Sequence, residues 1–242
     1  MTIFSRPLAA VAFCAAMAAL PAVGDQKDVA VFDLQLKGIN AGTLSLSGAS
    51  NGSSYAAIGV LKSGGLVALV KKVRYDARAS GLIDGDAFVP SRYEEDADTG
   101  KRQSQSVMQY VGGVPQVKKY SPPRKPRKQD VDPAAQGGTV DPLTALYAAL
   151  RDVPADHACD LKLTMFDGKR RSQVKLNKPR KSADGLTCAG EYRRLEGFSD
   201  KEMAEKQRFP FTMILAPAGD GMMRVMEISM DTIYGKGALK RR

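Results

Sequence analysis

The sequence is poor in the residues that form catalytic and metal centres. It has one histidine, three cysteines and no tryptophan in 242 residues. No nucleophile motif such as GxSxG accompanies His157, so the sequence gives no basis for a catalytic triad. The cysteines are not spaced as CxxC, and no further histidines are present to complete a metal site. We therefore expect a non-enzymatic protein with no cofactor and no metal.

Long apolar runs are also scarce, and the clearest one lies near the amino terminus. Residues 8–20 are apolar, follow the single charge of Arg6 and end just before Gly24. About 13 apolar residues are too few to cross roughly 30 Å of hydrocarbon comfortably, and this arrangement is typical of a secretory signal. We expect a signal peptide at residues 1–24, cleaved near Gly24. Residues 25–242 should then form a single soluble, β-rich periplasmic domain that does not span a membrane.

Removal of the signal peptide leaves two cysteines. Cys14 is lost with the signal, whereas Cys159 and Cys188 remain. An even number of cysteines in an oxidising compartment indicates a disulfide, and here only one pairing exists. Closing a loop of about 29 residues would stabilise the fold by roughly 3 to 4 kcal/mol in the chain-entropy treatment.

Apolar and polar residues alternate through the rest of the chain with the period of a half-buried β-strand. The first example is the run Phe32-Asp33-Leu34-Gln35-Leu36. Turn signals such as Asn51-Gly52 and Asp84-Gly85 separate the runs, so consecutive strands should be antiparallel. The pattern returns near residues 44–46, 73–78, 161–165, 174–176, 209–215 and 226–230. We predict a mainly β fold of about 11 to 13 strands, a single curved antiparallel sheet that forms a barrel, half-barrel or β-spiral.

Only short helices are expected. Asp141 supplies an N-cap before Pro142, and residues 143–151 place apolar side chains on one face. Ser199 and Glu202 have the spacing of a capping box. The fold class therefore includes one or two short helices, and residues 65–70 form either a further helical turn or a bulge.

The chain carries a formal net charge of +10, which favours polyanionic surfaces as partners. In a periplasm these surfaces are lipopolysaccharide, anionic lipid headgroups and acidic glycans, whereas nucleic acid is not an expected partner there. A basic, proline-rich and irregular loop at residues 121–138 holds the densest positive charge. Two interpretations of this loop stay open: docking on an anionic envelope component, and a solvated connector. Its candidate anion-binding residues are Arg124, Lys125, Arg127 and Lys128.

Two further charged groups call for interpretation. Arg170 and Arg171 follow the turn at Asp167-Gly168, and they either pair with acids on a neighbouring strand or face an anionic ligand. Acidic residues gather at residues 94–98. They lack the ligand order of a calcium-binding EF-hand loop, so we predict a charged hairpin turn.

One apolar segment is flanked by glycines and lysines, as at the mouth of a cavity that takes an acyl chain beside a charged headgroup. The alternative is that this segment packs across an open end of the sheet. The candidate rim residues are Leu66, Val67, Leu69, Val70, Lys71 and Lys72.

Several motifs together resemble a known family. They are the run Gly138-Thr139-Val140-Asp141-Pro142-Leu143, then Cys159, the run Phe166-Asp167-Gly168-Lys169-Arg170-Arg171, and Cys188-Ala189-Gly190. This combination resembles the exported bacterial proteins grouped as domain of unknown function 3108 (DUF3108). The resemblance implies a location in the cell envelope and a β-rich fold, but it brings no established activity and no catalytic residue.

These observations lead to one main hypothesis and two alternatives. The main hypothesis is a non-enzymatic periplasmic protein of the cell envelope that binds a lipid-like or amphipathic ligand inside the curved sheet. The second is a structural or scaffolding module that recognises an envelope protein or a glycan. The third is a hydrolase that uses carboxylates, which requires two of them to converge in a pocket.

Overall fold

The computed structural model describes residues 25–65, 68, 72–177, 179–183 and 185–242. In this part, 15 strands form one antiparallel sheet, accompanied by two α-helices and one 3-10 helix. The strands are β1 (Gln26–Leu36), β2 (Ile39–Ser50), β3 (Ser54–Ser63), β4 (Arg74–Asp84), β5 (Ala87–Asp98), β6 (Gln103–Val111), β7 (Val114–Ser121), β8 (Val153–Pro154), β9 (Lys162–Phe166), β10 (Arg171–Leu176), β11 (Arg180–Ser182), β12 (Gly185–Glu196), β13 (Arg208–Gly219), β14 (Met222–Thr232) and β15 (Gly235–Arg241). The helices are η1 (Pro133–Ala135), α2 (Pro142–Leu150) and α3 (Asp200–Glu205).

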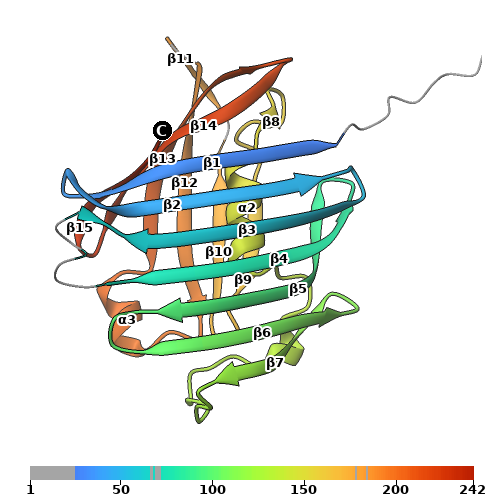
Figure 1. Ribbon diagram of the computed structural model, residues 1–242, viewed down its shortest axis with the longest axis vertical. Helices are drawn as coiled ribbons and strands as arrows, with labels where there is room; N and C mark the ends of the chain where they lie inside the picture. The colour runs from blue at the N-terminus through green and yellow to red at the C-terminus, as the bar shows by residue number, and fades with distance from the viewer. Residues whose placement is uncertain (1–24, 66–67, 69–71, 178, 184) are drawn as a thin grey trace, which may run out of the picture.

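The sheet folds over on itself without closing. Its strand order is β7-β6-β5-β4-β3-β2-β1-β15-β14-β13-β12-β10-β9, so β1 joins the first half of the chain to the last strand. Figure 1 shows β1 to β7 crossing the front of the molecule and the later strands running behind them at a steep angle, with α2 between the two groups. The predicted curved antiparallel sheet is confirmed, and its open edges make it a half-barrel.

The basic, proline-rich loop bridges the two edges of the sheet. The Gly138 N–H donates to the Gly113 carbonyl beside β7 (3.1 Å), and the Val140 N–H donates to the Thr164 carbonyl of β9 (2.9 Å). Helix η1 packs on β7. The chain from this loop to Val140 therefore contacts both edges, and unpaired strand edges would otherwise tend to recruit other chains.

Helix α2 begins where its sequence predicts, and it occupies the interior between the two groups of strands (Figure 1). Asp141 is the N-cap, and its carboxylate accepts a hydrogen bond from the Thr144 N–H (2.8 Å). Leu143, Tyr147 and Leu150 are buried. A Cβ at Gly48 would lie 2.3 Å from the Tyr147 ring, so the helix approaches β2 as closely as it does only because that strand has no side chain there. Helix α3 begins with the predicted capping box of Ser199 and Glu202.

Two predictions about the strands need correction. The count of 11 to 13 is too low because β8 and β11 contain only two and three residues, too few to show an alternation. The prediction that Met226 faces the interior, drawn from the period-two pattern, is also wrong. A bulge opposite Ile214 and Leu215 makes Met226 the extra residue of β14, so its side chain is 37% exposed whereas that of Val225 is buried.

Cys159 and Cys188 lie at disulfide distance, as predicted. Their Cα atoms are 5.5 Å apart, within the usual range for the bond, and both side chains are buried. The bond ties the segment before β9 to the first part of β12. Within the described ranges, no helix has both the length and the apolar character that crossing a membrane requires.

Candidate functional site

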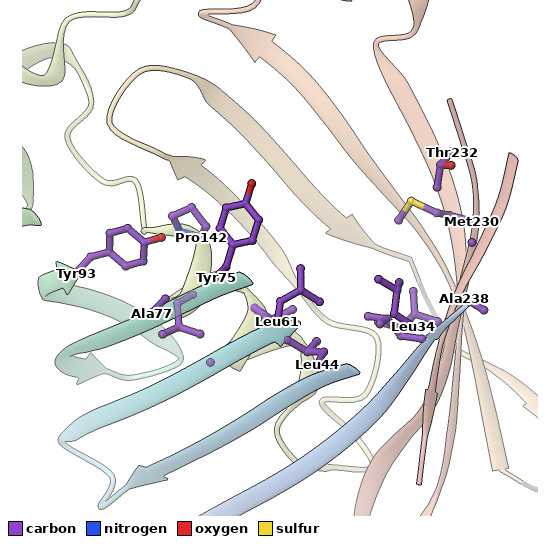
Figure 2. A pocket seen from close by; sticks show the side chains of 16 residues that line it. Leu34, Leu44, Leu61, Tyr75, Ala77, Tyr93, Pro142, Met230, Thr232 and Ala238 are labelled. Carbon is purple, nitrogen blue, oxygen red and sulfur yellow. The ribbon is translucent and has the colours of Figure 1, made fainter. Parts of the chain in front are cut away.

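An apolar cleft of about 390 Å³ lies between the two halves of the sheet. Strands β2 and β3 contribute Leu44 and Leu61, whereas β14 contributes Ile228 and Met230 on the opposite wall, and Leu143 of α2 forms part of the lining. Figure 2 shows side chains from both walls projecting into the same space. The volume lies within the range of small-molecule sites, which is roughly 300 to 1,000 Å³.

Small residues at inward positions create this space. Ala77 on β4 and Gly237 on β15 line the cleft, where larger residues would fill it. Gly59 on β3 admits the helix, because a Cβ there would lie 2.6 Å from the Leu143 Cδ1. Elsewhere the inward positions carry bulky residues such as Phe32 and Met213, which are fully buried. The interior is therefore packed around a cleft that these small residues leave open.

The cleft widens toward one end of the half-barrel. A neighbouring compartment of about 620 Å³ shares Leu34, Leu61, Met230, Thr232 and Gly237 with the cleft. The rest of its lining includes aromatic and cationic residues together with Ile233: Arg170, Tyr192, Arg194, Phe198, Phe209 and Tyr234. We call this compartment the mouth. An apolar interior thus leads to an opening that carries positive charge.

Two arginines are fixed at the mouth by an aromatic ring and by helix α3. The guanidinium groups of Arg170 and Arg194 lie 5.0 and 5.3 Å from the centre of the Phe198 ring, which is favourable cation–π geometry. Arg170 pairs with Glu202 (2.9 Å), and Arg194 donates to the Lys206 carbonyl at the end of α3 (2.9 Å). Hydrogen bonds from Ser199, together with both arginines, hold the pKa of Glu202 below its usual range.

The structure places the predicted site residues in different regions. Five of the six candidate rim residues lie outside the described residues: Leu66, Val67, Leu69, Val70 and Lys71. Lys72 is exposed and precedes Val73, which lines the mouth. Arg170, in the turn before β10, also lines the mouth, whereas Arg171 is the first residue of β10 and approaches Glu196 (3.9 Å). The two adjacent arginines therefore serve different surroundings.

The basic loop does not display all of its charges, contrary to one interpretation of its proline content. Arg124 folds back to pair with Asp130 (2.5 Å) and lies over the Tyr120 ring (5.6 Å). Lys169 lies over the same ring (5.0 Å). Arg124 is thus a structural residue. The positive charges that remain exposed in the loop are those of Lys125, Arg127 and Lys128.

The acidic cluster at residues 94–98 lies on β5, so the prediction of a charged hairpin turn there is wrong. The turn follows it, at residues 99–102. Along the strand, Glu94 and Asp96 face outward, whereas Glu95 faces inward and accepts a hydrogen bond from the Tyr93 hydroxyl (2.8 Å). Burial raises the pKa of Glu95. Within the described ranges, no group of three or more His, Cys, Asp or Glu side chains is arranged to hold a metal ion.

Sequence reasoning missed the electrostatic consequence of the α2 N-cap. Asp141 is fully buried, and its carboxylate accepts hydrogen bonds from the Thr144 N–H (2.8 Å) and hydroxyl (2.6 Å). Desolvation outweighs these bonds and raises the pKa of Asp141 from 3.8 to about 6. The available signal was the largely apolar sequence of the helix that begins after Asp141, because a helix that is apolar on most of its faces is usually buried.

We expect Asp141→Asn to change how stability depends on pH. Because the folded-state pKa of Asp141 is raised, its contribution to stability is complete below about pH 4 and is lost as the pH rises through about 6. Asparagine keeps an N-cap acceptor but does not titrate. Between about pH 7 and pH 4.5, wild type should gain about 2 kcal/mol of unfolding free energy relative to the variant.

Urea titrations at the two pH values measure this difference. Asp132→Asn, at the exposed N-cap of η1, is the matched control for introducing an amide at a helix start. A difference between wild type and Asp141→Asn that stays constant across this pH range would contradict the expected burial of the charge.

A second cavity, of about 380 Å³, lies at the opposite end of α2. Its lining includes Arg151, His157, Cys159 and Asp160 together with apolar residues such as Phe88. The Arg151 guanidinium lies 5.4 Å from the centre of the Phe88 ring. This cavity is more polar than the cleft, and α2 separates the two spaces.

Comparison with protein families identifies the family of this chain. A family described as "Protein of unknown function (DUF3108)" matches residues 31–193. The chain belongs to the DUF3108 family. The match runs from β1 into β12 and includes α2. The cleft wall formed by β14 and β15 therefore lies beyond the matched region.

Among solved structures, the DUF3108 chain is similar to one described as a β-barrel-like protein of domain of unknown function DUF1849 from Brucella abortus. The TM-score is 0.49 at 13% sequence identity, over 91% of this chain and 96% of that chain. No curated protein matches the sequence.

Proposed function

We propose that this protein is exported to the periplasm and binds a lipid-like amphipathic molecule, without chemical conversion, in the cleft between the two halves of its sheet. The observation that carries the proposal is the apolar cleft with a cationic, aromatic mouth at one end only. An acyl chain would lie against Leu44, Leu61 and Met230, and an anionic headgroup would lie near Arg170 and Arg194.

The composition of the lining favours an acyl chain over a polar ligand. The cleft walls consist almost entirely of aliphatic and aromatic side chains. A sugar or peptide would lose its hydrogen bonds with water there and find few replacements, which is costly. Each methylene group of an acyl chain instead gains about 0.8 kcal/mol on leaving water. The apolar part of the ligand therefore supplies affinity, and the mouth supplies discrimination between headgroups.

Two features support the proposed location. Residues 8–20 have the composition of a secretory signal core. The single pair of cysteines beyond that segment lies at bonding distance in the folded chain, and disulfides persist mainly in oxidising compartments such as the periplasm. A periplasmic carrier or sensor of amphipathic molecules is consistent with both features.

Binding of cis-parinaric acid, a fluorescent fatty acid, tests the proposed function. The mature chain, purified from the periplasm, should bind this probe in a saturable way. Dodecanoate should displace the probe, and dodecanol should displace it more weakly because dodecanol lacks the charge that the mouth complements. Native mass spectrometry and organic extraction of the same sample should reveal co-purified amphipathic molecules. A protein that binds no probe and yields no lipid extract would refute the proposal.

A further inference from the structure

The two ends of the half-barrel differ in charge. Because consecutive strands run antiparallel, their connections fall alternately at the mouth and at the opposite end, which holds the disulfide. Connections at the mouth end carry Lys37, Lys72, Lys101, Lys169 and Arg170. Connections at the disulfide end carry the acids Asp84, Asp86, Asp156, Asp160 and Asp220, together with the cations Arg151, Arg180 and Lys181. The molecule is thus polarised along the direction in which the cleft opens.

Two of the acids at the mouth end, Asp98 and Asp167, are engaged by their own turns. The Asp98 carboxylate accepts a hydrogen bond from the Gly100 N–H (2.7 Å). The Asp167 carboxylate accepts hydrogen bonds from the Lys169 and Arg170 N–H groups (2.9 and 2.8 Å). Asp200, Glu205 and Asp231 are exposed there and offset part of the positive charge. The lysines nearest the opening, Lys37 and Lys236, are exposed.

Large apolar side chains project into water around the same opening. Ile39 at the start of β2 is 52% exposed, and Ile233 and Tyr234 in the β14–β15 turn are 38% and 68% exposed. The two hairpins lie side by side, because the Lys37 N–H donates to the Lys236 carbonyl (2.7 Å). Ile233 and Tyr234 also line the mouth. Apolar tips interspersed with lysines therefore surround the entrance to an apolar interior.

We infer that the mouth end is a docking face for an anionic lipid bilayer. Ile39, Ile233 and Tyr234 enter the headgroup region, where tyrosine is favoured, and the neighbouring lysines lie over anionic phosphate groups. Docked in this way, the cleft opens directly onto the bilayer, and an acyl chain passes between the two without crossing water. This inference rests on the proposed function, since it names the membrane surface as the source or destination of the ligand.

Co-sedimentation of the mature chain with lipid vesicles tests the inference. The vesicles consist of phosphatidylcholine alone or of phosphatidylcholine mixed with phosphatidylglycerol. The protein should bind the mixed vesicles, and added NaCl should weaken the binding. The paired substitutions Ile233→Ser and Tyr234→Ser should weaken it about tenfold, because they remove the apolar tips. The paired substitutions Lys37→Glu and Lys236→Glu should abolish the preference for phosphatidylglycerol.

The matched control lies at the other end of the sheet. Leu82 and Val111 are 57% and 59% exposed, so Leu82→Ser combined with Val111→Ser removes comparable exposed apolar groups and should leave vesicle binding unchanged. The docking face is overturned if the control variant loses as much vesicle binding as the variant with Ile233→Ser and Tyr234→Ser. It is also overturned if the wild-type protein binds both kinds of vesicle equally. Failure to bind vesicles by a protein that still binds cis-parinaric acid also overturns it while leaving the proposed function intact. Vesicle binding by a protein that binds no fatty acid supports the docking face and refutes the proposed function.

Discussion

Replacing both Cys159 and Cys188 by serine is expected to lower the free energy of unfolding by about 3 to 4 kcal/mol. The bond closes a loop across a sequence separation of 29 residues, and chain-entropy arguments assign roughly this value to a loop of such length. The loss is a large fraction of the 5 to 15 kcal/mol that is typical of folded proteins. Urea unfolding followed by circular dichroism measures it, at a pH where both proteins fold reversibly.

Two controls separate the bond from the serines. Wild type treated with a reductant should lose a similar amount, because the same constraint is removed without a new hydroxyl group. Ala158→Ser introduces a hydroxyl at a neighbouring buried position while the bond stays intact, so it measures the cost of burying that group. A double-serine variant that unfolds at the same urea concentration as wild type would show that the bond contributes little to stability.

Local sequence patterns predict most of the elements of this fold. Alternation over five or more residues identified strands such as β1 and β13, because a half-buried strand has to place its apolar side chains on one face. The Asp141-Pro142 pair identified the start of α2, because both residues suit the first turn of a helix. Strands β8 and β11 were not predicted because they are too short to show an alternation. Met226 was placed on the wrong face because a bulge interrupts the alternation in β14.

The cleft could not be predicted in the same way, because its walls come from distant parts of the chain. Leu44 and Leu61 meet Met230 only because β1 pairs with β15 and brings the carboxy-terminal strands over the amino-terminal ones. No short-range pattern determines that pairing. The small residues Ala77 and Gly237 help to create the cleft. In the sequence, however, a small residue on a strand is equally compatible with close packing.

Charged residues were predicted least well, since their partners are set by tertiary structure. Arg124 reads as part of an exposed basic run, yet Asp130 and the Tyr120 ring lie close enough to hold it. Arg170 and Arg171 are adjacent in sequence, but only Arg170 reaches the mouth. The number of charges in a sequence therefore does not tell which of them are available to a ligand, because the fold determines that.

Filling the cleft should abolish binding of the fatty-acid probe. Ala77 projects into the cleft from β4, opposite the wall that carries Met230 (Figure 2). In Ala77→Trp the indole ring would occupy space equivalent to about four methylene groups of a bound chain. At about 0.8 kcal/mol for each methylene group, the loss is about 3 kcal/mol, or an affinity for cis-parinaric acid about a hundredfold lower. Fluorescence titration measures the affinity of each variant.

Ala56→Trp is the matched control for this substitution. Ala56 lies on the neighbouring strand β3 but is exposed on the outer face of the sheet, so the same ring added there leaves the cleft open and the affinity unchanged. Thermal unfolding of both variants verifies that each remains folded. If Ala77→Trp binds the probe as tightly as wild type, the fatty acid occupies another site, and the more polar cavity beside Arg151 and His157 becomes the next place to test. If both variants lose binding equally, the effect arises from the sheet as a whole and gives no support to a ligand in the cleft.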